Sequence, residues 1–131
     1  MKTFTAFLTL AILAFTALVS AATDYENAVK CGKRFPKVSQ AIEKFCSKQK
    51  DGKLTNDLVV PSEYAKKGVH TIGLKGKKIF LNILGDCAPA QWVPYNWCNA
   101  QFYDLCANSV TGYNWRRHGK DDCQWFGISE R

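Results

Sequence analysis

The sequence predicts an α+β fold: a small disulfide-stapled two-layer sandwich in β-α-β-β-α-β order, with an antiparallel sheet and two helices on one face. Three observations predict it. Two segments repeat apolar residues with the period of a helix. Other segments are short apolar runs rich in β-branched residues, as strands are. Six cysteines follow an apolar leader.

The leader has the three-part pattern of a secretory signal peptide. It has a positive start, an apolar and uncharged stretch over residues 4–19, and small residues before the cleavage point. A membrane anchor is the alternative, but Asp24 follows where a basic stop usually stands. We therefore expect cleavage of residues 1–21. Residues 22–131 then form a single secreted, extracellular domain that is monomeric and has no membrane span.

The cysteines predict the covalent framework. All six lie after the leader: Cys31, Cys46, Cys87, Cys98, Cys106 and Cys123. An even number in a short exported chain predicts three disulfide bonds, because the secretory route is oxidising. A zinc site is the alternative, but such sites usually hold cysteine pairs about two to four residues apart. The closest pair here is Cys98 and Cys106. We expect no metal and no cofactor.

The basic charge is concentrated in one part of the chain. The formal net charge is +7, and removal of Lys2 with the leader makes it +6. Residues 22–86 hold 13 Lys/Arg against 7 Asp/Glu, whereas residues 87–131 hold 4 of each. Such a field attracts anionic partners, so we expect an anionic, glycan or protein target outside the cell. The alternative is a solvated lysine-rich surface with no partner.

The first half of the domain predicts a strand, a helix and a hairpin. Residues 25–31 are expected to form a first strand. A helix should begin at Pro36, which suits the first turn of a helix, and end before Asp51-Gly52. Its buried stripe follows helical spacing: Val38, Ala41, Ile42, Phe45 and Cys46. Residues 69–74 and 79–84 then flank a loop that contains glycine, which predicts a β-hairpin.

The second half predicts another helix and a last strand. The helix follows Pro94, and its buried face carries Cys98, Phe102, Leu105 and Cys106. Eight helical residues rise about 12 Å, whereas bridged Cα atoms lie within roughly 7 Å. Cys98 and Cys106 therefore cannot pair with each other, and twelve of the fifteen possible pairings remain. A bond from Cys106 to Cys123 suits the last strand, which runs to Ile128.

A resemblance follows from the stretch 87–128. It contains the runs Trp97-Cys98, Gln101-Phe102, Leu105-Cys106 and Cys123-Gln124-Trp125-Phe126. With the leader, three bridges and the predicted element order, the chain resembles the small cysteine-rich secreted proteins of fungi, including killer-toxin-like effectors and glycan-binding proteins. The resemblance implies an extracellular effector or toxin-like role in virulence, or a lectin-like role, and carries over no functional residue. We therefore expect a non-enzymatic binding protein.

Aromatic and basic residues of the second half are the candidate binding site. The run Tyr113–His118 combines ring faces, guanidinium donors and an amide in an expected loop, and Trp92 and Trp97 precede it. Seven residues are candidates for ligand binding: Trp92, Trp97, Tyr113, Trp115, Arg116, Arg117 and His118. The alternative is a plain exposed loop. We assign Phe102, Trp125 and Phe126 to the core, because aromatic side chains dominate small cores.

A secreted metal-independent ribonuclease is the alternative function. Pro61-Ser62-Glu63-Tyr64, after Cys31 and the first helix, resembles guanyl-specific fungal ribonucleases and their degenerate relatives. Such chemistry needs a base, an acid and cations at the phosphate. Five residues offer these groups: Glu63, His70, Arg116, Arg117 and His118. Ser62 stands where those enzymes have a histidine after proline, so we assign no catalytic residue.

Overall fold

The computed structural model describes residues 23–108 and 113–130 of the 131-residue chain. In these ranges, four strands form one antiparallel sheet and two short strands pair with each other. The fold is therefore an α+β fold held by three disulfides, as the sequence predicts. The predicted signal peptide, residues 1–21, lies outside the described residues.

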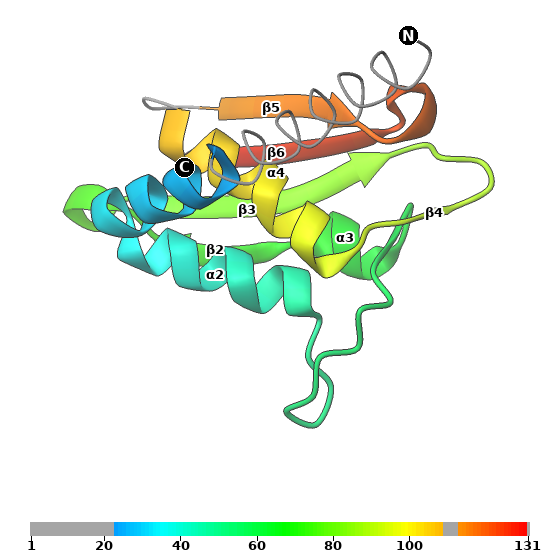
Figure 1. Cartoon of the computed structure of the whole chain (residues 1–131), viewed down its shortest axis with the longest axis horizontal. Coiled ribbons are helices and arrows are strands. Elements are labelled where there is room, and N and C mark those ends of the chain that lie inside the picture. Colours follow the sequence, from blue (N-terminus) through cyan, green and yellow to red (C-terminus); the bar gives the residue numbers. More distant parts are fainter. Residues whose placement is uncertain (1–22, 109–112, 131) are drawn as a thin grey trace, which may run out of the picture.

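The described chain begins with helical residues 23–34. The helices and strands that follow, in chain order, are α2 (Pro36–Ser47), β1 (Val59–Val60), α3 (Glu63–Lys67), β2 (Val69–Ile72), β3 (Lys78–Gly85), β4 (Gln91–Trp92), α4 (Tyr95–Asn108), β5 (Tyr113–His118) and β6 (Gln124–Glu130) (Figure 1). Short 3₁₀ turns at Leu74–Gly76 and Lys120–Asp122 join β2 to β3 and β5 to β6.

The main sheet has the strand order β2-β3-β6-β5 and is antiparallel throughout. Strands β2 and β3 are the predicted hairpin, and β6 is the predicted last strand. The whole of β6 pairs with β3, from Ile79 to Gly85, so these two strands form the centre of the sheet. Strands β2 and β5 form its opposite edges. The pair β1 and β4 makes a separate small sheet.

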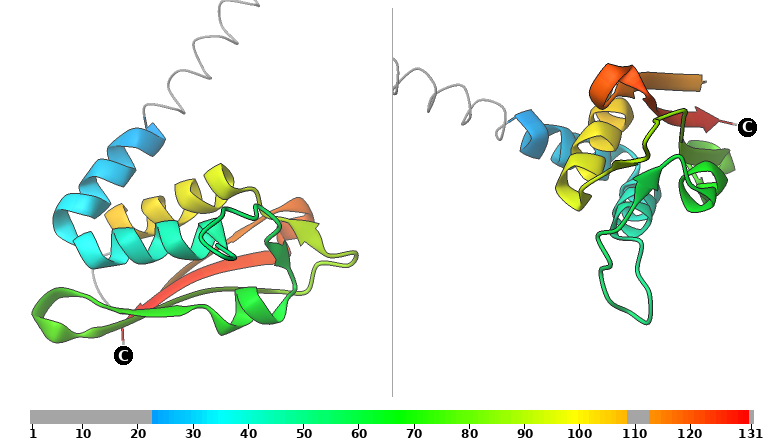
Figure 2. Two further views of the ribbon diagram at one scale, coloured as in Figure 1. Left: turned by 90° about the horizontal axis from the view of Figure 1, so that it is seen from below. Right: turned by 90° about the vertical axis from the view of Figure 1, so that its right-hand side faces the viewer.

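Helices α2 and α4 lie side by side on one face of the main sheet, as predicted (Figure 2). Their apolar stripes and the inward-facing strand residues bury one core, in which Phe102 stands edge-on to both Phe45 and Phe126. The short helix α3 lies beside β3, where Asn82 Nδ2 donates to the carbonyl of Lys66 (3.2 Å). Over β5 and β6, none of the described helices covers the opposite face (Figure 2).

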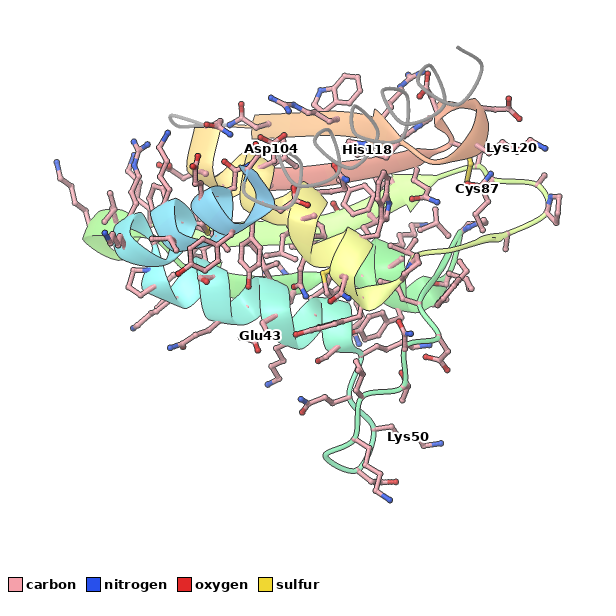
Figure 3. The ribbon with its side chains drawn as sticks, viewed as in Figure 1. Glu43, Lys50, Cys87, Asp104, His118 and Lys120 are labelled. Atoms are coloured by element: carbon pink, nitrogen blue, oxygen red, sulfur yellow. A yellow bond between two sulfur atoms is a disulfide. The ribbon has the colours of Figure 1, made fainter. Side chains whose placement is uncertain are left out.

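Helix α2 forms as its sequence predicts. Proline stands in its first turn, where the missing N–H costs nothing, and the predicted stripe is the buried face. The helix ends at Lys48, whose left-handed backbone (φ 42°) turns the chain into a loop over residues 48–57. This loop, which we call the arm, projects from the rest of the molecule, and Lys50 lies near its tip (Figure 3).

The predicted strand over residues 25–31 is wrong, because these residues are helical. Two contacts with the end of α4 hold this helix: Lys30 Nζ donates to Asn108 Oδ1 (3.5 Å), and Asn108 Nδ2 donates to Asn27 Oδ1 (3.4 Å). Strand β5 supplies the fourth strand of the sheet instead. The fold class is therefore as predicted, but the predicted element order is not, because the first element is a helix and β5 is an additional strand before β6.

The disulfides join elements that are distant in sequence. They are Cys31–Cys106, Cys46–Cys98 and Cys87–Cys123. Cys98 and Cys106 bond to different partners, as the rise of a helix requires. The predicted bond between Cys106 and Cys123 is wrong. The N-terminal helix brings Cys31 to Cys106, and the pairing of β3 with β6 brings Cys87 to Cys123.

These three bonds suggest a secreted or extracellular protein, because disulfides persist in oxidising compartments. Among the described helices, none is both long enough and apolar enough to span a bilayer.

Candidate binding surface on the open face of the sheet

The predicted binding loop Tyr113–His118 is in fact edge strand β5, so its residues alternate between the two faces of the sheet. Its register with β6 identifies the faces. Arg116 lies opposite the fully buried Phe126, and His118 lies opposite the buried Gln124. Arg116 and His118 therefore face the helices. Trp115 and Arg117 face the other way, on the side that we call the open face.

The inward residues of β5 are engaged with α4. Arg116 forms an ion pair with Asp104 of α4. The ring of His118 stands edge-on to Trp97 (5.8 Å between centroids) and to Phe126 (5.2 Å). Burial lowers the pKa of His118 below its ordinary value, the neighbouring Arg116 lowers it further, and Asp104 and Asp122 oppose the shift. Figure 3 shows Asp104 and His118 at the interface of α4 with the sheet.

The outward residues of β5, Trp115 and Arg117, form a cluster with Trp125 of β6. The guanidinium of Arg117 lies 5.6 Å from the ring centroid of Trp115 and 5.0 Å from that of Trp125. Both distances are within the range of a cation–π contact. Among the described residues, no carboxylate lies within ion-pair distance of Arg117. The Arg117 guanidinium thus contacts two indoles, and no carboxylate among the described residues neutralises its charge.

The open face continues across the sheet to β2. Side chains alternate along each strand and share a face with their cross-strand partners, so the register assigns the members: Trp115, Arg117, Trp125, Gly127, Ser129, Lys78, Phe80, Asn82, Leu84, His70 and Ile72. His70 packs on Phe80 with 4.7 Å between ring centroids. Trp115 and Ile72, at opposite edges, are 49% and 47% exposed. Large apolar side chains therefore reach solvent at both edges.

The charge of the open face has one sign. Among the described strand residues that the register places on this face, the charged side chains are Lys78 and Arg117, and both are basic. The neighbouring Lys77 pairs with Glu130 (2.5 Å), whereas in the described structure no ion pair engages Lys78. Asp121 and Asp122 lie in the turn beyond the end of β5. An anion on this face would therefore meet cations and aromatic rings but no carboxylate from the strands.

A hollow of about 700 Å³ adjoins the β2 edge of this face. Its lining residues are His70, Gly76, Lys77, Lys78, Ile79 and Phe80. It lies at the hairpin end of β3, at the corner diagonally opposite Arg117. The open face thus ends in a basic hollow at one corner and in the arginine–indole cluster at the other.

Two other predicted site residues, Trp92 and Trp97, do not join this surface. Trp92 is 55% exposed in β4, where its Nε1 donates to the carbonyl of Asn56 (2.8 Å). Trp97 is 42% exposed on α4 and contacts His118 on the helix side of β5, away from Trp115. Tyr113 begins β5, but its side chain lies outside the described residues. The three candidate tryptophans, Trp92, Trp97 and Trp115, therefore lie in three different places.

Two members of the open face escaped the sequence interpretation. The sequence assigns Trp125 to the core with Phe102 and Phe126, but of these three only the two phenylalanines are fully buried, and Trp125 faces outward beside Arg117. The sequence offers His70 only as a possible ribonuclease group, whereas the structure places it on the open face, where it packs at a tilt on Phe80. Because adjacent residues of a strand face opposite sides, the burial of Phe126 could have indicated that Trp125 faces outward. The contact of His70 with Phe80 depends on the pairing of β2 with β3, which the sequence does not show.

The five groups proposed for ribonuclease chemistry are spread over the molecule. His70 lies on edge strand β2 and Arg117 on the opposite edge strand β5, both on the open face. Arg116 and His118 face the helices, and Glu63 lies in the first turn of α3. The structure therefore does not gather these five side chains into one site.

The described residues hold no group of three or more His, Cys, Asp or Glu side chains that would suit a metal ion. Comparisons of the chain with protein-family models, with curated proteins and with solved structures give no match in any of the three.

Proposed function

We propose that this protein is a secreted, non-enzymatic binding protein, of an effector, toxin-like or lectin-like kind, that recognises an anionic target with the open face of its sheet. The observation that carries the proposal is the arginine–indole cluster. Arg117 is held by Trp115 and Trp125, has no carboxylate partner among the described residues, and lies on a face without acidic strand residues. A cation ordered in advance loses little conformational freedom on binding.

Two further observations support an anionic ligand. The basic excess of residues 22–86 makes the field around the domain positive, which steers anions toward it. Arginine also pairs with carboxylate, sulfate or phosphate through two parallel N–H donors. The aromatic members of the face add apolar contact area beside these donors.

The test is a titration of the disulfide-bonded domain, followed by tryptophan fluorescence, with heparin and polygalacturonate, and with neutral dextran as the reference. We expect both polyanions to bind and dextran not to bind. Affinity should fall with added salt, because exposed charge contacts are screened over about 10 Å at 0.1 M salt.

Matched neighbours on β5 and α4 locate the site. Arg117→Gln and Trp115→Ala should weaken binding of the polyanions. Arg116→Gln, whose side chain faces α4, and Trp97→Ala, on the helix side, should leave binding unchanged. Equal weakening by Arg116→Gln and Arg117→Gln, or binding of neither polyanion, would overturn the proposal.

A further inference from the structure

The two cations of the open face stand at diagonal corners. Arg117 lies opposite Trp125 on β6, which lies opposite Leu84 on β3. Lys78 stands on the same strand as Leu84, six residues away. With a rise of about 3.3 Å per residue and strands about 4.8 Å apart, the two Cα atoms are separated by about 22 Å.

The surface between these corners has apolar and aromatic side chains at its two ends and Asn82, Gly127 and Ser129 between them. Trp125 and Leu84 lie beside Arg117, and Phe80 with Ile72 lies beside Lys78. Asn82 in the middle is buried because the last turn of α3 covers it, and that turn carries the exposed Lys66 and Lys67. A ligand long enough to reach both cations would therefore meet rings and aliphatic side chains at each end and pass beside α3, where it would meet the two lysines.

From this arrangement we infer that the ligand is a linear acidic polysaccharide that lies diagonally across the open face and is held at both corners. The inference rests on the proposed function and adds the class and the length of the ligand. A small anion would fill only one corner. Acidic groups that repeat along a chain would reach Arg117 at one end and Lys78 with the basic hollow at the other.

The ring contacts favour sugar over stacked bases. The Arg117 guanidinium lies over a ring of each neighbouring indole, and His70 packs at a tilt against the ring of Phe80. Single-stranded nucleic acids are bound without sequence preference on aromatic faces that are open for stacking. Pyranose rings do not need a fully open aromatic face, because their C–H groups can pack on any exposed part of an indole. The acidic groups of such sugars accept hydrogen bonds from the arginine and lysine donors.

The experiment measures affinity as a function of ligand length. Oligogalacturonides, which carry carboxylates, and heparin-derived oligosaccharides, which carry mainly sulfates, are titrated from disaccharides to chains longer than the diagonal. Affinity should rise about tenfold or more once both corners are spanned, because the second contact is intramolecular. The series whose affinity rises more steeply with chain length shows whether the surface prefers carboxylates or sulfates.

Single substitutions at each corner test the two-point contact. Arg117→Gln and Lys78→Gln should each abolish the rise of affinity with chain length, because each leaves a single corner for the ligand. Arg116→Gln and Lys53→Gln, in the arm, are the controls and should preserve the rise. If long chains bind no better than disaccharides, or if the corner variants keep the rise, the polysaccharide inference is wrong while anion binding at this face stands.

Two other outcomes separate this inference from the function on which it rests. Tighter binding of single-stranded RNA or of an acidic protein than of any oligosaccharide would contradict the ligand class but retain the surface. Failure of every polyanion to bind would contradict both.

Discussion

The two sides of strand β5 carry similar residues but hold them in different ways. Arg116 and Arg117 are neighbours in sequence, yet Asp104 neutralises the first and two indoles flank the second. Trp97, on the inner side, packs on His118, whereas Trp115, on the outer side, packs on Arg117. Alternation along one strand thus separates residues that stabilise the fold from residues that are available to a ligand.

The largest test of this difference compares Phe126 with Trp125, adjacent residues on opposite faces of β6. Phe126 is fully buried between Phe102 and His118. Phe126→Ala should reduce the free energy of unfolding by about 3–5 kcal/mol. Trp125→Ala should cost clearly less, because its indole is partly exposed. Urea unfolding followed by circular dichroism measures both. Similar losses would contradict the assignment of faces.

The next test removes a covalent bond from the helix side. The Cys46–Cys98 bond joins α2 to α4 and closes a separation of 52 residues. Replacing both cysteines by alanine should reduce the free energy of unfolding by about 2–5 kcal/mol. The arginine–indole cluster is on the other side of the sheet. At a temperature where the variant is folded, its affinity for polyanions should therefore match that of the parent, and a large loss of affinity would show that the two sides are coupled.

A smaller effect is expected from the ion pair on the inner side of β5. Arg116 and Asp104 form a partly exposed pair, so a double-mutant cycle with Arg116→Gln and Asp104→Asn should give a coupling of about 0.2–1 kcal/mol. A cycle between Arg117→Gln and Asp104→Asn serves as the control and should give no coupling, since Arg117 points to the open face. Thermal or urea unfolding provides the values.

The pH dependence of stability tests the environment of His118. Its pKa is lower in the folded protein than in the unfolded chain, so below the ordinary histidine value, about 6.5, the unfolded chain binds more protons. Stability should therefore decrease as the pH falls from about 7 toward the folded pKa. His118→Asn should remove this part of the slope in urea unfolding measured between those pH values. An unchanged slope would contradict the prediction.

Much of the fold was predictable because burial leaves a periodic trace. Helices α2 and α4, the hairpin and β6 all bury apolar residues at helical or alternating spacing. The helix over residues 23–34 has a sparse apolar pattern, because α4 holds it by one disulfide and by polar contacts of Asn27 and Lys30. Polar contacts leave no periodic apolar pattern, so the sequence does not indicate this helix. The Cys31–Cys106 bond depends on the helix and is therefore not predicted either.

The candidate site was predictable only in part. Strand β5 has polar residues on both sides, because its inner side is completed by Arg116 and His118 instead of aliphatic residues. A strand of this kind lacks the alternation of apolar with polar residues by which strands are recognised, and it was interpreted as a loop. Trp115 and Arg117 were identified as candidates, but their partner Trp125 depends on the register of β5 with β6.

The arm has a consequence for survival among proteases. Residues 49–54 are exposed, and the tip carries Lys50 and Lys53, so trypsin-like enzymes can reach it. A cut there leaves Cys31 and Cys46 on one fragment, and their bonds run to Cys106 and Cys98 on the other. On a non-reducing gel the cleaved protein would therefore still run as one band, and it would separate into two fragments only after a reductant is added. Such a nicked molecule would keep its sheet intact, because every strand of it lies C-terminal to the cut.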